Sequence, residues 1–397
     1  MFALDKTITG DSSLLFEKEN FSDKEDFFII GKSVLDQSKD FLNIIKLCGT
    51  KLEINIPNNF LKMVSQLTVH EFDLWQKVMP KSIYENYCNE IFEKAKKALE
   101  KTDFNYYENI FLKSFKLLNS LQKIKVNKKK WEFLNNNEIV GINRDIIDSL
   151  KPDENGFCEQ IIYDQFSTTT GRLTVKSGPQ ILRLNKEYKS VFKSRHKGGK
   201  IVQFDYVSLE PRIALILAGH NPGVDIYSDI NKMVFDEKFE RDICKLSTLS
   251  VMYGMSAKNL AEKTNLSISD CQNIILPKLK EYFGVHSRNI KLMKEMKNNG
   301  FIRNHFGRAI YPNDSSAHIL YSCFNQSSAF DAGMLGFLNV VEILPSDVLP
   351  IFIIHDNLGL DIPKNYFDNN ELFEKIKEAI NPISNFPGKL IVAYDNI

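Results

Sequence analysis

Features that would assign this chain to a membrane, secreted or zinc-binding class are absent from the sequence. No run of about 18 apolar residues occurs, which excludes a transmembrane helix and predicts that no membrane is a partner. The start, Met1-Phe-Ala-Leu-Asp-Lys, has neither the apolar stretch nor the cleavage site of a secretory signal. The six cysteines include no Cys-x-x-Cys pair, which fits a reducing compartment and argues against structural zinc. We therefore expect a cytoplasmic protein, in the host cytoplasm if a phage encodes it.

An excess of either charge is also lacking. The 51 Lys and Arg residues nearly balance the 50 Asp and Glu residues, which gives a net charge of +1. Any binding of nucleic acid must then rest on local clusters of charge. The 397 residues contain no internal repeat and leave room for two or three domains.

One such local cluster spans residues 121–137, where five lysines surround Trp131. Two interpretations stay open for it. The cluster is either the solvated start of a helix or a set of contacts to phosphate groups.

The periodicity of apolar residues gives a coarse map of the elements. We expect strands at 27–30, 351–354, 358–362 and 389–393, and a strand or a helix at 42–47. Strands at 188–192 and 201–204 should form a hairpin around a turn at 197–200. Helices are expected within 80–120, 211–218, 238–264 and 268–298.

Two acidic residues stand at the ends of apolar strands. Asp205 follows Ile201-Val-Gln-Phe, and Asp356 separates Ile351-Phe-Ile-Ile-His from Asn-Leu-Gly-Leu-Asp-Ile362. Taken alone, each Asp is more typical of a helix cap or a turn. Two strand-end carboxylates that meet in space would instead bind two divalent ions, which stabilise the attacking and leaving oxygens of a phosphoryl transfer.

A third segment places cations on one face of a helix. Residues Arg241, Lys245, Leu249 and Tyr253 follow one another at a spacing of four, so they share a face. Arg and Lys one turn apart suit a triphosphate, and the apolar and aromatic residues beyond them suit a base and sugar. The alternative is an amphipathic helix with a solvated basic edge.

These three segments together resemble motifs A, B and C of family A DNA polymerases, the bacterial DNA polymerase I type. Motif A is similar to residues 205–212, motif B to 241–254 and motif C to His355-Asp356. Further matches follow the family's order over about residues 105–397: Tyr107-Glu-Asn-Ile110 through Leu134, Thr168-Thr-Thr-Gly-Arg172-Leu, Asp225-Ile-Tyr227, Gly307-Arg308 and Asn325-Gln326-Ser-Ser-Ala.

The resemblance implies an α+β fold, the right-hand polymerase, with an antiparallel palm sheet, helical fingers and a reduced thumb. The domains expected from it are an N-terminal domain at 1–105, a reduced thumb at 106–160, palm at 161–222 with motif A, fingers at 223–300 with motif B, and palm at 301–397 with motif C.

The resemblance also implies roles for single residues. Asp205, Asp356 and the Tyr206 carbonyl would hold two Mg²⁺ ions, with Mn²⁺ as a substitute, and Lys245 would be a general acid toward pyrophosphate. The implied nucleotide contacts are Arg241, Lys245, Leu249, Tyr253, Glu210 and Tyr227, with Glu210 as the gate against ribose. The implied contacts to primer–template DNA are Thr170, Arg172, Lys186, Arg212, Gln326 and His355.

Several positions depart from the family pattern. Leu249 replaces an aromatic residue, Asn357 replaces the acid after the motif C Asp, Pro211 interrupts motif A, and Lys186 stands where Arg is usual. Only about twenty residues separate Leu134 from Gly156, where the family has a long helical thumb. We therefore expect weak DNA grip and low processivity, with a processivity or replisome partner as compensation.

The first 105 residues and the choice of template leave alternatives open. Asp23-Lys24-Glu25 has the Asp-x-Glu pattern of a proofreading exonuclease motif. That motif stands at the end of a strand, however, and here the apolar run follows the acids. A degenerate exonuclease remnant or a docking domain is the expectation. DNA-templated synthesis from dNTPs is the leading function. The alternatives are a translesion or RNA-templated enzyme of the same fold, and a catalytically inactive DNA-binding paralogue.

Overall fold

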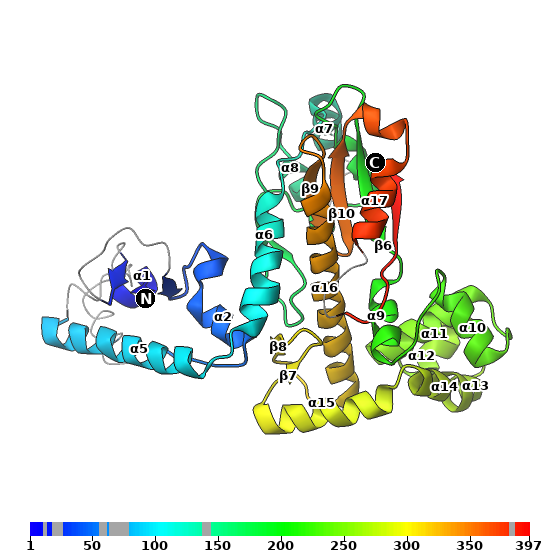
Figure 1. Ribbon diagram of the computed structural model, residues 1–397, viewed down its shortest axis with the longest axis horizontal. Coiled ribbons are helices and arrows are strands. Elements are labelled where there is room, and N and C mark those ends of the chain that lie inside the picture. Colours follow the sequence, from blue (N-terminus) through cyan, green and yellow to red (C-terminus); the bar gives the residue numbers. More distant parts are fainter. Residues whose placement is uncertain (11–13, 18–26, 55–61, 63–78, 137–143, 381–385) are drawn as a thin grey trace. The chain divides into compact units, whose positions relative to one another are not determined.

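The computed structural model describes residues 1–10, 14–17, 27–54, 62, 79–136, 144–380 and 386–397 (Figure 1). The chain divides into two compact units. One comprises Met1–Leu112 with Gly307–Ala309, and the other comprises Lys113–Phe306 with Ile310–Ile397. The Asp23-Lys24-Glu25 segment lies outside the described residues.

The N-terminal unit is built on a small sheet with the strand order β2-β1-β3. Its strands are β1 (Phe2–Leu4), β2 (Leu15–Phe16) and β3 (Phe28–Ile30), and its described helices are α1 (Lys6–Thr9), η1 (Gln37–Lys39), α2 (Phe41–Leu47), α5 (Lys81–Lys101) and η3 (Tyr107–Phe111). Residues 42–47, for which the sequence allowed a strand or a helix, belong to the helix α2. The Asp40 carboxylate accepts a hydrogen bond from Asn43 N and caps this helix. The apolar face of α5 closes the core of this unit over Phe2 and Phe41.

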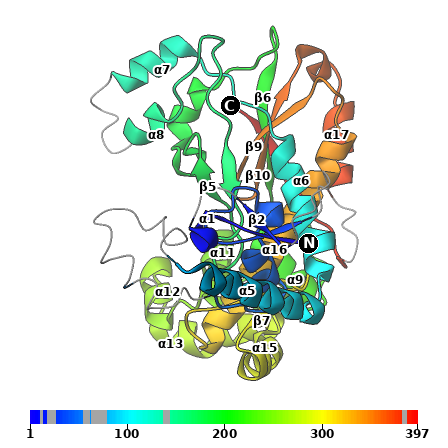
Figure 2. The same cartoon turned by 90° about the vertical axis from the view of Figure 1, so that its left-hand side faces the viewer.

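A four-stranded sheet with the order β11-β6-β10-β9 forms the centre of the larger unit. All its neighbours are antiparallel. The strands are β6 (Lys200–Tyr206), β9 (Leu349–Ile354), β10 (Asn357–Ile362) and β11 (Val392–Asn396). Figure 2 shows these strands beside α17 (Glu371–Ala379). The predicted antiparallel palm sheet is therefore present.

The two faces of β6 differ because its side chains alternate. Phe204 and Tyr206 point to the face where Phe373 of α17 and Phe337 of α16 (Ala317–Ile343) pack. Tyr206 also donates a hydrogen bond to Gly333 O at 2.9 Å. A Cβ atom at Gly336 would lie 2.3 Å from the Tyr206 hydroxyl, so only glycine lets β6 approach α16 this closely. Asp205 points to the opposite face, where its side chain is exposed.

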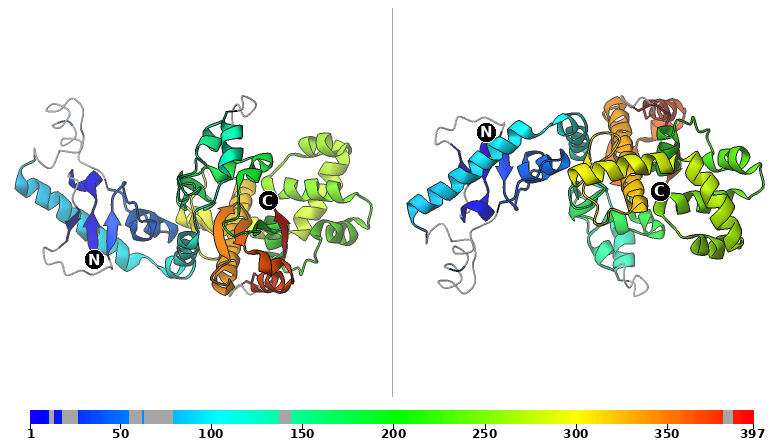
Figure 3. Two further views of the ribbon diagram at one scale, coloured as in Figure 1. Left: turned by 90° about the horizontal axis from the view of Figure 1, so that it is seen from above. Right: turned by 90° about the horizontal axis from the view of Figure 1, so that it is seen from below.

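The predicted helical fingers are a cluster of short helices around one apolar core that includes Ile230, Cys244 and Leu279. They are gathered in one group in Figure 3. The members are α10 (Ile226–Phe235), α11 (Arg241–Tyr253), α12 (Ala257–Thr264), α13 (Ile268–Asp270), η7 (Cys271–Ile275) and α14 (Leu276–Tyr282), followed by α15 (Val285–Asn299). The helix α9 (Leu209–Leu217) leads from β6 toward them.

Smaller elements complete the larger unit. Among the described residues of 113–160, the helices are short: α6 (Leu112–Ser120), α7 (Lys128–Asn135) and α8 (Arg144–Asp148). The remaining elements are β4 (Ile162–Asp164), β5 (Thr174–Ser177), η5 (Ile181–Arg183), η6 (Lys186–Val191), β7 (Ile302–Arg303), β8 (Ala309–Ile310, which starts in the other unit) and η8 (Lys364–Phe367). None of the helices in the described ranges carries an apolar stretch long enough to cross a bilayer.

The predicted hairpin at 188–204 is wrong. Residues 186–191 form the 3₁₀ helix η6, and β6 pairs with β10 and β11. The segment after η6 pairs with residues 125–127, because Lys193 N donates to Lys125 O and Asn127 N donates to Val191 O. The final strand also lies later than predicted, at Val392–Asn396.

Candidate active site

The two predicted carboxylates lie on neighbouring strands. Asp205 is opposite Asn357 in the antiparallel pair β6–β10, and Tyr206 N donates to Asp356 O at 3.1 Å. Asp205 is exposed and Asp356 is half-buried. The two strand ends therefore meet, which is the condition that the metal-binding interpretation requires.

The turn that carries Asp356 is strained. Ile354 pairs with Asn357, which leaves His355 and Asp356 as a two-residue loop. His355 has a φ of 54°, and Asp356 is not among the residues with positive φ. A hairpin with positive φ at only its first loop residue normally has glycine there. Such strain in a non-glycine residue is characteristic of functional sites.

Desolvation raises the pKa of both carboxyl groups. Desolvation, followed by the charge of Asp356, raises the pKa of Asp205 from 3.8 to about 6, although Lys189 opposes the shift. Desolvation also raises the pKa of Asp356, and the charges of His355 and Arg172 oppose it. A cation placed between these groups would remove the repulsion between them.

The residues at these strand ends fit a divalent cation. The side-chain oxygen of Asn357 is buried beside Asp205 and has no hydrogen-bond partner among the described residues. No group of three or more His, Cys, Asp and Glu residues is close enough to enclose a metal within the described part of the chain. Mg²⁺ is commonly held by one or two carboxylates together with substrate phosphates, which suits this sparse set of ligands.

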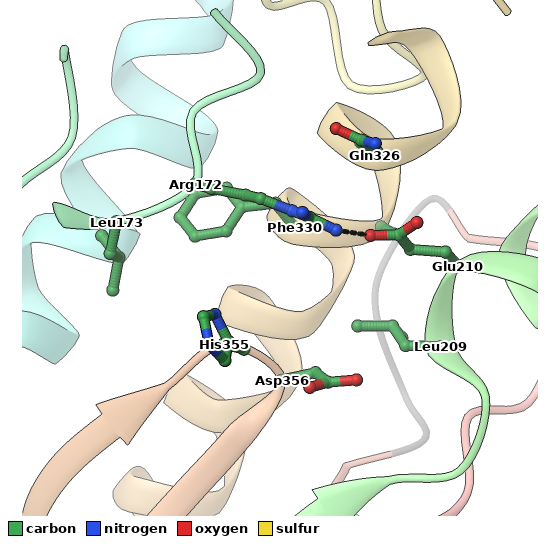
Figure 4. Close-up of a pocket in the computed structure, with 9 residues that line it drawn as sticks. Arg172, Leu173, Leu209, Glu210, Gln326, Phe330, His355 and Asp356 are labelled. Atoms are coloured by element: carbon green, nitrogen blue, oxygen red, sulfur yellow. Dashed lines mark hydrogen bonds and ion pairs between the residues drawn. The ribbon is translucent and has the colours of Figure 1, made fainter. Parts of the chain in front are cut away.

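Glu210 links the palm to the fingers. Its carboxylate accepts hydrogen bonds from Arg172 and from the Tyr253 hydroxyl, through different oxygens. Glu210 therefore contacts Tyr253, the tyrosine of the segment that resembles motif B. Figure 4 shows Arg172 reaching across to Glu210 above His355 and Asp356.

A small pocket lies beneath this bridge. Its volume is about 80 Å³, and its lining includes Gln326, Phe330, His355 and Asp356. Gln326 and His355, which were predicted to contact DNA, are thus brought to the same place as the carboxylates (Figure 4).

The predicted cations of the fingers lie on α11 but differ in their contacts. Arg241 Nε donates to Asp225 Oδ2 at 2.7 Å, and its guanidinium lies 5.2 Å from the centre of the Tyr227 ring. This bond lowers the pKa of Asp225. Lys245 is exposed one turn later and has no ion-pair partner in the part of the chain that is described. The Leu249 side chain is half-buried, and Tyr253 is 43% exposed.

Three predicted contacts need correction. Arg212 is 1% exposed, and its guanidinium donates to backbone carbonyls of Val207, Gly223 and Val224. It therefore holds a loop and cannot reach DNA. Thr170 is also buried, so its neighbour Arg172 is the one that reaches the pocket. Tyr227 is 4% exposed and lies under Arg241, so it has little surface left to contact a phosphate.

Lys186 is fully on the surface, but it is not part of this pocket. Its ammonium group lies 3.9 Å from an Asp395 carboxylate oxygen, and its side chain is 90% exposed. It lies in η6, next to the edge of the palm sheet formed by β11.

Two features were missed by sequence reasoning. Lys189 lies close enough to Asp205 for each charge to shift the pKa of the other group, but the wrong hairpin prediction hid this. A cavity of about 480 Å³ in the fingers, with His286, Asn289 and His318 in its lining, corresponds to no motif. No local sequence signal marks it, because its walls come from four helices.

The chain is similar to several known proteins. The family model of DNA polymerase family A matches residues 90–392. DNA polymerase I of Aquifex aeolicus (strain VF5) is 24% identical over 254 residues, which are 58% of this chain and 42% of that protein. The DNA polymerase of Mycobacterium phage D29 is 27% identical over 47% of this chain and 33% of that protein. The chain thus spans less than half the length of these relatives.

A solved structure with a similar fold is the POL domain of Pol1 from M. smegmatis, in a complex with DNA primer-template and dNTP. The TM-score is 0.64 at 14% identity, over 90% of this chain and 81% of that one. At this identity the similarity shows the fold alone.

Proposed function

This chain belongs to DNA polymerase family A, and from that premise we propose that it extends the 3′-end of a primer on a DNA template with deoxynucleotides. The observation that carries the proposal is the meeting of Asp205 and Asp356 on adjacent strand ends of the palm sheet. The basic face of α11 belongs to the same compact unit.

The reaction follows from the chemistry of these groups. The primer 3′-oxygen forms a bond to the α-phosphorus, its proton passes to water, and the bond to the β-phosphate oxygen breaks. Arg241 and Lys245 are one turn apart and would hold the triphosphate, the first as a fork and the second as a point charge. Lys245 would protonate the departing pyrophosphate. Tyr253, exposed at the end of α11, would stack on the new base pair.

Asp205, Asp356 and the Tyr206 carbonyl would hold two Mg²⁺ ions, or Mn²⁺ in their place. Bound there, the ions would neutralise charge on the attacking and leaving oxygens. Arg172, Gln326 and His355 surround the small pocket beside Asp356 and would contact the primer and template near the reacting end.

Glu210 would select the sugar. Its carboxylate is fixed from two sides, by Arg172 and Tyr253. A carboxylate held in place cannot turn aside for a 2′-hydroxyl group, so ribonucleotides would be excluded.

Primer extension tests the proposal. The purified chain is incubated with a primed DNA template and Mg²⁺, with dNTPs and rNTPs in parallel reactions. Asp356→Ala is the inactive variant, and Asp368→Ala, at an exposed acid outside the site, is the matched control. We expect extension with dNTPs by the wild type and Asp368→Ala only. Extension by Asp356→Ala, or none by the wild type with either metal, would refute the proposal.

The inactive-paralogue alternative gains no support, since both carboxylates and both α11 cations are retained. The translesion or RNA-templated alternative rests on Leu249 and the short thumb alone. The proposal includes a replisome or processivity partner, because the expected DNA grip is weak. It also includes a cytoplasmic location, which follows from the family.

A further inference from the structure

The Tyr163 side chain joins two elements that carry residues of the candidate site. It lies in β4, which pairs with β5, and it is buried. Its hydroxyl group donates to Ile353 O at 2.7 Å and accepts from Ile353 N at 3.0 Å. Desolvation raises the pKa of this hydroxyl, so it stays protonated and able to donate at neutral pH. One side chain thus satisfies both backbone groups of a residue 190 positions away.

Ile353 needs this contact because it lies on an edge of the palm sheet. Its strand, β9, has β10 as its one neighbour among the described strands. Ile354 and Asn357 close the two-residue loop of this hairpin, so they bond to each other and the backbone groups of Ile353 point away from β10. Ile353 is fully buried, and buried N–H and C=O groups without partners are costly. The Tyr163 hydroxyl therefore takes the place that a further strand would fill.

The same contact lies beside the turn that carries Asp356. Ile353 precedes the strained residue His355 by two positions. With β10 on one side and Tyr163 on the other, both edges of β9 are held directly before the turn. The position of Asp356 is thereby linked to the position of β4.

β4 continues into the loop that carries Arg172. Hydrogen bonds brace this loop from within, because Phe166 N donates to Asp164 Oδ1 at 2.7 Å and Thr168 Oγ1 donates to Arg172 O at 2.7 Å. A braced loop moves together with the strand from which it starts. The Arg172 side chain reaches from the end of this loop to the Glu210 carboxylate (Figure 4).

We propose that Tyr163 is a positioning residue, whose hydroxyl group sets the place of Arg172 relative to Asp356 and thereby fixes the Glu210 carboxylate from one side. The inference rests on the proposed function, in which Glu210 excludes ribonucleotides. It gives a role in sugar selection to a residue that is not part of the pocket lining. Tyr163 touches neither the nucleotide nor a metal ion and acts through Arg172.

Tyr163→Phe tests the inference, because it keeps the buried ring and removes only the hydroxyl group. The preference for dNTPs over rNTPs is measured as the ratio of kcat/KM values in single-nucleotide incorporation. This ratio does not depend on the fraction of folded enzyme, so a loss of stability alone leaves it unchanged. We expect the ratio to fall about fivefold, which is the effect of losing one hydrogen bond of ordinary strength.

Two comparisons show whether the effect passes through Arg172. Tyr107→Phe is the matched control, because the Tyr107 hydroxyl donates to Ser38 O at 2.8 Å in the N-terminal unit, and it should keep the wild-type ratio. In an Arg172→Ala background, Tyr163→Phe should lower the ratio no further, since the side chain through which it acts is gone. A wild-type ratio for Tyr163→Phe, or an equal fall in both backgrounds, would overturn the inference.

Hydrogen–deuterium exchange tests the same contact without catalysis. Tyr163→Phe should speed the exchange of amides around Ile353 and also in the loop between β4 and β5, whereas Tyr107→Phe should speed neither. Faster exchange at Ile353 with an unchanged loop would show that the hydroxyl only caps the strand edge, which overturns the inference. If the wild type does not extend primers, the proposed function fails, and the exchange pattern alone decides whether Tyr163 holds the two elements together.

Discussion

Glu210 accepts hydrogen bonds from two side chains at once, and this decides how a substitution there should act. Removal of the carboxylate in Glu210→Ala opens space for a 2′-hydroxyl and also releases Arg172 and Tyr253. We expect the preference for dNTPs over rNTPs to fall by ten- to a hundredfold, which corresponds to about 1.4–2.8 kcal/mol. Single-nucleotide incorporation measures it as the ratio of kcat/KM values.

Glu210→Gln is the matched comparison, because it keeps the bulk and loses the charge. It should retain most of the sugar preference if bulk excludes the hydroxyl group. If Glu210→Ala keeps the full preference, Glu210 is not the gate.

A second residue-scale prediction concerns pH. Because the pKa of Asp205 rises from 3.8 to about 6 on folding, the folded state binds this proton more tightly than the unfolded state. The resulting stabilisation is complete below pH 3.8 and is lost as the pH rises through 6. In the presence of a chelator, Asp205→Asn should therefore be more stable than the wild type at pH 7.5.

The gain should be about 1 kcal/mol, since exposure of Asp205 screens the repulsion, or roughly 2 °C in Tm. The gain should vanish near pH 4, where the wild-type carboxyl is neutral. Thermal melts from pH 4 to 8 measure it, with Asp368→Asn as the exposed control. Equal Tm values for wild type and Asp205→Asn at pH 7.5 would contradict the assigned shift.

At the scale of elements, Arg212 fastens α9 to the loop that precedes α10. Its guanidinium donates to carbonyls of Val207, Gly223 and Val224. Arg212→Met would leave these carbonyls without donors, so we expect a loss of about 2–4 kcal/mol in the free energy of unfolding. Urea denaturation measures this loss.

The same variant separates a structural role from DNA contact. Arg212→Met should leave the salt slope of DNA binding unchanged, because the guanidinium does not reach the surface. Arg183→Met, at an exposed arginine of the same unit, should leave stability unchanged. A wild-type free energy of unfolding for Arg212→Met would show that other groups satisfy the carbonyls.

The elements also show what the sequence could and could not predict. The strands that carry Asp205 and Asp356 have local apolar patterns, so their ends and their acids were predictable. The false hairpin arose because residues 191–193 pair with residues 125–127, which are far away in the sequence. Arg212 has the local context of a surface cation, and only the loop at 222–224 makes it a buried one. The direction in which the lysines of residues 121–137 point depends on the same pairing with residues 191–193.

At the scale of the whole molecule, the short helices in the described part of 113–160 predict that the protein dissociates from DNA rapidly. We expect the purified chain to add only a few nucleotides per binding event and to be more sensitive to salt than to temperature. Primer extension with a heparin trap measures this, at 50 and 150 mM salt. Products of hundreds of nucleotides in the trapped reaction at 150 mM salt would contradict the prediction.

The bond between Arg241 and Asp225 bears on how a nucleotide enters. The Asp225 carboxylate occupies an anion position at the Arg241 guanidinium. If Arg241 holds the triphosphate as proposed, phosphate oxygens would replace this carboxylate at a guanidinium that is already oriented by its bond to Asp225. The same carboxylate caps α10, because Asp225 Oδ1 accepts from Tyr227 N and Oδ2 accepts from Ser228 Oγ. These two bonds do not involve Arg241, so an exchange of Asp225 for phosphate at Arg241 would leave the start of α10 capped and its helix intact.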